Sequence, residues 1–127
     1  MAKFECTIPG RYSFDETLKY FHDYLSTCSV TASFEDGSNY QSGNLRIAVR
    51  VYERYTVMGG NRLSMTVTLA TAGDDIFASA ITAAGSQGLA KVFNWGEDEF
   101  LKYFISAAEQ FDGMAPVKTY DPFFSAQ

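Results

Sequence analysis

The sequence predicts an α+β protein: a single antiparallel sheet of five to six strands, with two amphipathic helices packed on one face. Three observations predict this class. Several segments alternate between apolar and polar residues, as half-buried strands do, and two segments carry an apolar stripe at helical spacing. These segments follow the order β-α-β-β-β-β-β-α. An antiparallel sheet can bury one face under helices and leave the other in water.

The first predicted strand is followed directly by the first predicted helix. Residues 3–8 alternate in polarity, and Pro9 with Gly10 ends the strand. Ser13 and Glu16 match the capping box that starts a helix. Beyond that start, one apolar stripe recurs at helical spacing, formed by Phe14, Leu18, Phe21, Leu25 and Cys28.

Five further strands are predicted between the two helices. In the first of them, Val30, Ala32 and Phe34 are expected to point inward. The five are residues 29–35, two strands within residues 45–69, residues 76–84 and residues 89–95. Clusters of turn-forming residues separate them, at residues 36–39, 72–75 and 85–88.

The second predicted helix completes the domain. Glu97, Asp98 and Glu99 place three acids in its first turn, where they favour the helix dipole. An apolar stripe follows, formed by Phe100, Leu101, Phe104, Ile105, Ala108 and Phe111. We therefore expect one domain over residues 1–113. Residues 114–127 contain two prolines and predict an irregular C-terminal tail, whose apolar side chains dock on the domain or on a neighbouring chain.

The central hairpin predicts which face of the sheet is buried. A three-residue loop at residues 59–61 sorts the two strands into an apolar and a polar face, whereas a two-residue loop mixes them. That loop pairs Val51 with Leu69 and Tyr55 with Met65. Leu45, Ile47, Val49 and Val51 are then expected to face the helices. Arg46, Arg50, Tyr52 and Arg54 are expected to face outward.

Composition limits the classes of function. The chain has 127 residues, 46% of them hydrophobic, and a net charge of −5. It lacks the basic footprint of a general nucleic-acid binder, and no apolar run approaches the ~18 residues of a membrane-spanning helix. The first residues do not resemble a signal peptide. Cys6 and Cys28 are therefore expected to be reduced thiols in a cytoplasmic protein.

No set of acid, base and nucleophile can be assembled from the sequence. His22 is the single histidine, and we interpret it as a surface residue because no partner converges on it. Cys6 and Cys28 fall on apolar faces and are interpreted as inert buried thiols. Asp74 and Asp75 are interpreted as turn formers, since a calcium site needs more oxygen ligands. We expect no metal and no cofactor, and we favour a function other than catalysis.

Two functions fit this chain. The favoured one is a non-catalytic binding module that holds a small apolar ligand between sheet and helices. Its candidate ligand-binding residues are Glu53, Tyr55, Phe21 and Phe104, with Glu53 as a polar anchor. The alternative is a homo-oligomeric module, such as a homodimer, or a protein-interaction module that uses the exposed sheet face. Its candidate interface residues are Arg46, Arg50, Tyr52 and Arg54.

Two resemblances add to this interpretation. The order of elements resembles a reduced helix-grip fold, as in START and Bet v 1-like ligand-binding proteins, where a curved sheet wraps a C-terminal helix and often leaves a cavity. Such proteins typically have a seventh strand and a short extra helix, which are not expected here. The hairpin YERYTVMGGNR, with the later segments GDDIFASAI and GSQ, is similar to a family of short uncharacterised bacterial proteins known as a domain of unknown function. That resemblance spans residues 4–111 and implies no activity, cofactor or site residue.

Overall fold

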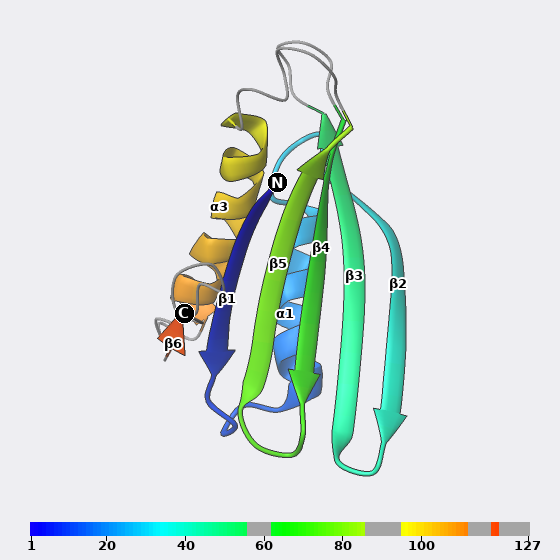
Figure 1. Cartoon of the computed structure of the whole chain (residues 1–127), viewed down its shortest axis with the longest axis vertical. Helices are drawn as coiled ribbons and strands as arrows, with labels where there is room; N and C mark the ends of the chain where they lie inside the picture. The colour runs from blue at the N-terminus through cyan, green and yellow to red at the C-terminus, as the bar shows by residue number, and fades with distance from the viewer. Residues whose placement is uncertain (56–61, 86–94, 112–117, 120–127) are drawn as a thin grey trace.

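A single antiparallel sheet carries both helices on one face, so the predicted α+β class is confirmed (Figure 1). The computed structural model describes residues 1–55, 62–85, 95–111 and 118–119. In chain order the elements are β1 (Ala2–Ile8), α1 (Phe14–Ser26), β2 (Ser33–Ser42), β3 (Leu45–Tyr55), β4 (Arg62–Thr71), β5 (Ile76–Ala84), α3 (Trp95–Gln110) and β6 (Lys118–Thr119). The strands lie in the order β2-β3-β4-β5-β1-β6.

The N-terminal end of α1 has the predicted capping geometry. Ser13 is extended, with φ −69° and ψ 149°, and its hydroxyl accepts a hydrogen bond of 3.0 Å from the amide of Glu16. Phe14, Phe21 and Leu25 of the predicted stripe are buried, with no more than 8% of each exposed. The spacing of apolar residues therefore predicted correctly which side of this helix meets the sheet.

The space between the sheet and the helices is filled by aromatic side chains. Phe21 of α1 stacks on Phe104 of α3 with ring centroids 5.1 Å apart, and both are almost completely buried. The hydroxyl of Tyr20 donates a 2.7 Å hydrogen bond to the carbonyl of Ala107 and so joins the two helices. Small residues of β5, among them Ala78 and Ala80, are completely buried in the same core cluster, consistent with dense packing of large against small side chains.

The register of the β3–β4 hairpin differs from the predicted one. Tyr55 pairs with Arg62, Tyr52 with Met65 and Val51 with Thr66, because β3 ends at Tyr55 and β4 begins at Arg62. The predicted pairing of Val51 with Leu69 and of Tyr55 with Met65 is therefore wrong, and the loop predicted at residues 59–61 lies outside the described residues. This register reverses the parity, so odd-numbered residues of β3 share a face with even-numbered residues of β4.

The predicted faces of β3 are therefore exchanged. The helices cover the odd residues of β4, namely Leu63, Met65, Val67 and Leu69, all 2% exposed or less. On β3 the same face carries Ala48 and Tyr52 together with Arg46, Arg50 and Arg54. Arginine tolerates this position because its stem can pack while its guanidinium reaches water or an aromatic ring. The apolar residues Leu45, Ile47, Val49 and Val51 instead point away from the helices.

The second strand is displaced along the chain from its predicted place. β2 runs through residues 36–39, which were predicted to form a turn, and the turn falls at Gly43, whose φ is +57°. Val30, predicted to point inward, is fully exposed. The predicted strand at residues 89–95 lies outside the described residues except for Trp95, which begins α3. Within the predicted tail, β6 pairs with β1, and the other residues of 114–127 are not described.

Candidate functional site

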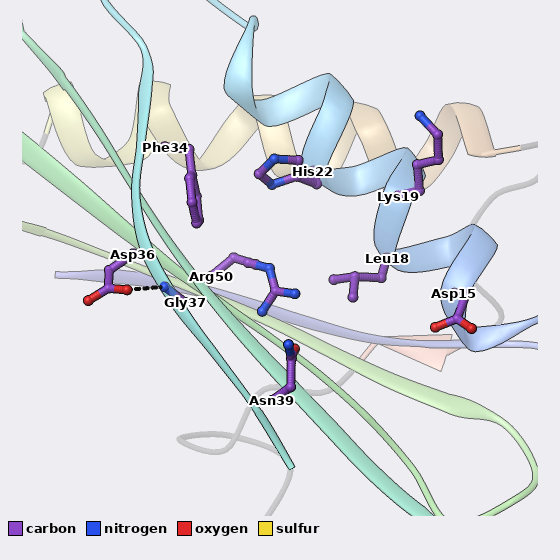
Figure 2. Close-up of a pocket in the computed structure, with 9 residues that line it drawn as sticks. All are labelled: Asp15, Leu18, Lys19, His22, Phe34, Asp36, Gly37, Asn39 and Arg50. Atoms are coloured by element: carbon purple, nitrogen blue, oxygen red, sulfur yellow. Dashed lines mark hydrogen bonds between the residues drawn. The ribbon is translucent and has the colours of Figure 1, made fainter. Parts of the chain in front are cut away.

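A groove of about 540 Å³ runs between helix α1 and two strands, the edge strand β2 and its neighbour β3 (Figure 2). We call it the α1–β2 groove. It lies on the helix side of the sheet, beside the packed core. Three elements line it with the residues Asp15, Leu18, Lys19, His22, Phe34, Asp36, Gly37, Asn39 and Arg50.

Arg50 enters the groove from β3. Its Nη1 donates hydrogen bonds to the carbonyls of Val49, at 2.8 Å, and Ser38, at 3.2 Å. Gly37 pairs with Arg50 across the strands, and a Cβ at Gly37 would lie 2.9 Å from Arg50 Cδ and 3.0 Å from Nη1. The absence of a side chain at Gly37 therefore lets the arginine lie across β2.

A hydrogen bond between His22 and Tyr52 forms the inner wall of the groove. His22 Nδ1 and the Tyr52 hydroxyl are 3.0 Å apart, and Tyr52 is 1% exposed. Burial raises the pKa of Tyr52 well above its usual range, partly offset by the charge of Arg50, so this phenol stays protonated. The His22 ring also contacts Phe34 edge-on, at a centroid distance of 4.9 Å. His22 is thus half-buried in a polar contact, and its interpretation as an ordinary surface residue is wrong.

The other charges at the groove are largely paired with one another. Asp15 accepts a 2.8 Å hydrogen bond from Arg46, and this bond and the charge of Arg46 lower the pKa of Asp15. Lys19 pairs with Asp23 one turn further along α1. Arg50 differs from these groups, because no carboxylate pairs with it within the part of the chain that the structure describes.

The candidate residues from the sequence do not come together as predicted. Phe21 and Phe104 lie in the core, while Glu53 and Tyr55 lie on the opposite face of the sheet. There Glu53 Oε1 forms an ion pair of 2.6 Å with Arg62, in a geometry that makes no aligned hydrogen bond. Of the predicted interface set, Arg46, Arg50, Tyr52 and Arg54 all lie on the helix side. Sequence reasoning missed Phe34, Gly37 and Asn39 as groove residues.

Arg54 lies deeper on that side than the other two arginines. Its guanidinium carbon is 5.9 Å from the centre of the Phe100 ring and 5.6 Å from that of Tyr103. Its Nε is buried and has no hydrogen-bond partner among the described residues. The rings of α3 thus replace a carboxylate as the partner of this charge.

The remaining candidates for chemistry give no further site. Both cysteines are free thiols, Cys6 buried and Cys28 half-buried, and burial raises the pKa of each. Over the described ranges, no three His, Cys, Asp or Glu side chains gather into a possible metal site. No described helix is long and apolar enough to span a membrane.

The fold and groove together define a two-layer α+β domain with a polar groove at one edge and a second sheet face that neither described helix covers. The chain belongs to the family described as "Family of unknown function (DUF6054)", which it matches over residues 1–112. No curated protein and no solved structure matches it.

Proposed function

We propose that the protein is a self-associating interaction module, in which the sheet face turned away from the helices binds the same face of a second copy. We call this surface the open face. The observation that carries the proposal is an uncharged, largely apolar area at its centre. This central patch consists of Ile47, Val49, Val51, Thr66, Thr68, Ala70, Phe77, Ser79 and Ile81.

The apolar side chains of the open face are accessible. Phe77 is 40% exposed and Ile81 is 38% exposed, and Tyr40 on the neighbouring edge is 58% exposed. The branched residues of β3 on the same face, Ile47, Val49 and Val51, are half-buried. A contiguous apolar surface of this kind is typical of interaction sites rather than of a face that meets only water.

The shape of the open face is compatible with a second copy as the partner. Val49 and Val51 of β3 lie beside Thr68 and Thr66 of β4, which are of similar size, so the centre of this face is even. A two-fold axis parallel to the strands and between β3 and β4 sets the β3 row of each copy over the β4 row of the other. Near the axis, Val49 then lies over the partner's Thr68 and Val51 over the partner's Thr66. Stacked sheets cross at about 30°, so this matching is closest near the axis.

Charge and area are compatible with such a dimer. A net charge of −5 opposes self-association, but the central patch itself carries no charge, and the acid of β2 nearest to it is Asp36, which pairs with Val51. At one end of the patch, Glu53 and Arg62 form an ion pair, so each copy presents one negative and one positive charge to the same pair on the partner. With the axis between β3 and β4, the four strands β2 to β5 of each copy overlap. At about 4.8 Å apart and about seven residues long they give roughly 450 Å² of flat area per copy. Side-chain relief adds to this flat area, and a standard interface buries ~800 Å² per partner.

The other predicted function receives less support. A small apolar ligand between sheet and helices would occupy space that Phe21, Phe100 and Phe104 fill, each 1% exposed or less. The resemblance to the helix-grip fold and the cytoplasmic location stay predictions.

Sedimentation equilibrium of the full chain tests the proposal. At about 100 µM, where a micromolar dimer is mostly associated, we expect twice the chain mass of 14.1 kDa. Val49→Lys and Thr68→Lys each place a charge in the interface and should give monomers with unchanged circular dichroism. Gln110→Lys places the same charge on the exposed surface of α3 and should leave the dimer intact. A monomeric wild type, or a dimer that survives both open-face substitutions, would refute the proposal.

A further inference from the structure

We propose that the α1–β2 groove binds a small carboxylate with one negative charge and an aromatic or aliphatic body, with Arg50 as its anchor. This site goes beyond self-association, because the groove and the open face lie on opposite sides of the sheet. Either can therefore function when the other does not.

The first support is the bonding of Arg50. Among the described residues, Nη1 alone forms hydrogen bonds, and both acceptors are neutral carbonyls. Within the described part of the chain, Nη2 and Nε have no partner and no carboxylate pairs with the guanidinium. A half-buried guanidinium with an unused edge can take a planar carboxylate through two parallel hydrogen bonds.

The second support is the position of the side chain. In Figure 2, Arg50 extends from β3 toward α1, and Asn39 points from β2 toward the same space. The bonds to the carbonyls of Val49 and Ser38 hold the guanidinium in place before a ligand arrives. Such preorganisation lowers the entropic cost of binding.

The surrounding charges select a monoanion. Asp15 lies at one end of the groove, where Arg46 neutralises it. Asp36 lies near the other end, and its carboxylate accepts a 2.8 Å hydrogen bond from the amide of Gly37. Lys19 is already paired with Asp23. Among the described groups of the groove, Arg50 is thus the cation without a carboxylate partner, which suits a ligand with a single negative charge, whereas it would neutralise a phosphate dianion only in part.

The walls of the groove can contact the apolar part of such a ligand. Phe34 is 44% exposed although it stands on the helix side, and Leu18 of α1 is half-buried. An aromatic or aliphatic group placed between them would cover both. The His22 ring, held by the Tyr52 hydroxyl, supplies a polar edge beside this apolar wall. The volume of about 540 Å³ falls within the usual ~300–1,000 Å³ of small-molecule sites.

A titration of the ¹⁵N-labelled full chain with phenylacetate tests the site. We expect saturable amide shifts confined to residues 15–22 and 34–50, and weak or no binding of benzyl alcohol and inorganic phosphate. Arg50→Gln should weaken phenylacetate binding by about tenfold or more, the effect of losing a charge-assisted pair. Arg62→Gln removes the same charge from the open face and should leave the affinity unchanged.

A second variant keeps the test decisive if Arg50→Gln fails to fold. Asn39→Asp adds a negative charge on the exposed edge strand, where folding should tolerate it, and should also abolish phenylacetate binding. The inference is overturned if a folded Arg50→Gln binds phenylacetate as the wild type does, or, where Arg50→Gln does not fold, if Asn39→Asp binds it as the wild type does. It is equally overturned if phosphate or benzyl alcohol binds as tightly as phenylacetate, or if the shifts fall on the open face.

Discussion

At the scale of single residues, Cys6 shows how burial controls reactivity. The side chain lies on β1 under the helices, 2% exposed, and burial raises the pKa of its thiol from 9.0 to about 11. Because the thiolate is the reactive form, Cys6 should be labelled slowly by thiol reagents at neutral pH until the chain unfolds.

The same shift predicts a pH dependence of stability. The folded-state pKa of Cys6 is raised, so its contribution is complete below about pH 9, where the unfolded thiol is also protonated, and is lost as pH rises toward about 11. Urea unfolding of the wild type and of Cys6→Ala between pH 7 and 10 measures this contribution. The difference in unfolding free energy should shrink above pH 9, since Tyr52 and all other groups are common to both proteins. A difference that stays constant with pH would show that the Cys6 thiol is not shifted.

At the scale of elements, the two sides of β4 should respond oppositely to charge. Met65 is completely buried under the helices, whereas Thr66 points to the open face. Met65→Asp should therefore cost about 3 kcal/mol or more, because it buries an unpaired charge. Thr66→Asp should cost less than about 1 kcal/mol. Urea unfolding at low protein concentration, where any dimer is dissociated, makes this comparison. Equal losses in the two variants would contradict the register described here.

The two helices and four of the strands were predictable because each carries its own local signal. Ser13 with Glu16 and the stripe from Phe14 to Leu25 define α1 without reference to the rest of the chain. The pairing of β3 with β4 depends instead on where the connecting loop begins and ends, and Gly59 with Gly60 indicates a turn without fixing its limits. A shift of the β3–β4 pairing by one residue exchanges the two faces of β3. Since β3 alternates apolar residues with arginines, either face could have been chosen.

The groove was not predictable for a related reason. Its wall on β2 requires that strand to continue through Gly37 and Asn39, which form a turn-like sequence. The signal that could have extended the strand is Gly43 followed by Asn44, a pair suited to the positive φ found at Gly43. Arg50 would still have been placed on the wrong side, because its location follows from the β3–β4 register.

At the scale of the whole molecule, the sheet joins distant parts of the chain. β1 has β5 on one side, from Ala2 paired with Thr82 to Ile8 paired with Ile76, and β6 on the other. By contrast, β2 to β5 follow one another as neighbours in both sequence and space. The helices pack across this arrangement, with α3 against β5 and β1 and α1 against β3 and β2.

This arrangement has a consequence for synthesis on the ribosome. β1 leaves the exit tunnel long before residues 76–84, so its apolar side chains Phe4, Cys6 and Ile8 have no sheet to join until β5 has emerged. Pairing between strands so far apart in sequence is slow, because the entropy of loop closure is lost before the strand contacts lower the free energy. A chain ending at residue 75 should therefore leave the amides of β1 unprotected in hydrogen exchange, whereas the full chain should protect them. Protection of β1 in the shorter chain would mean that it finds another partner. Until residues 76–84 have emerged, β1 lacks its partner strand in the sheet, and we expect it to be a binding site for a chaperone.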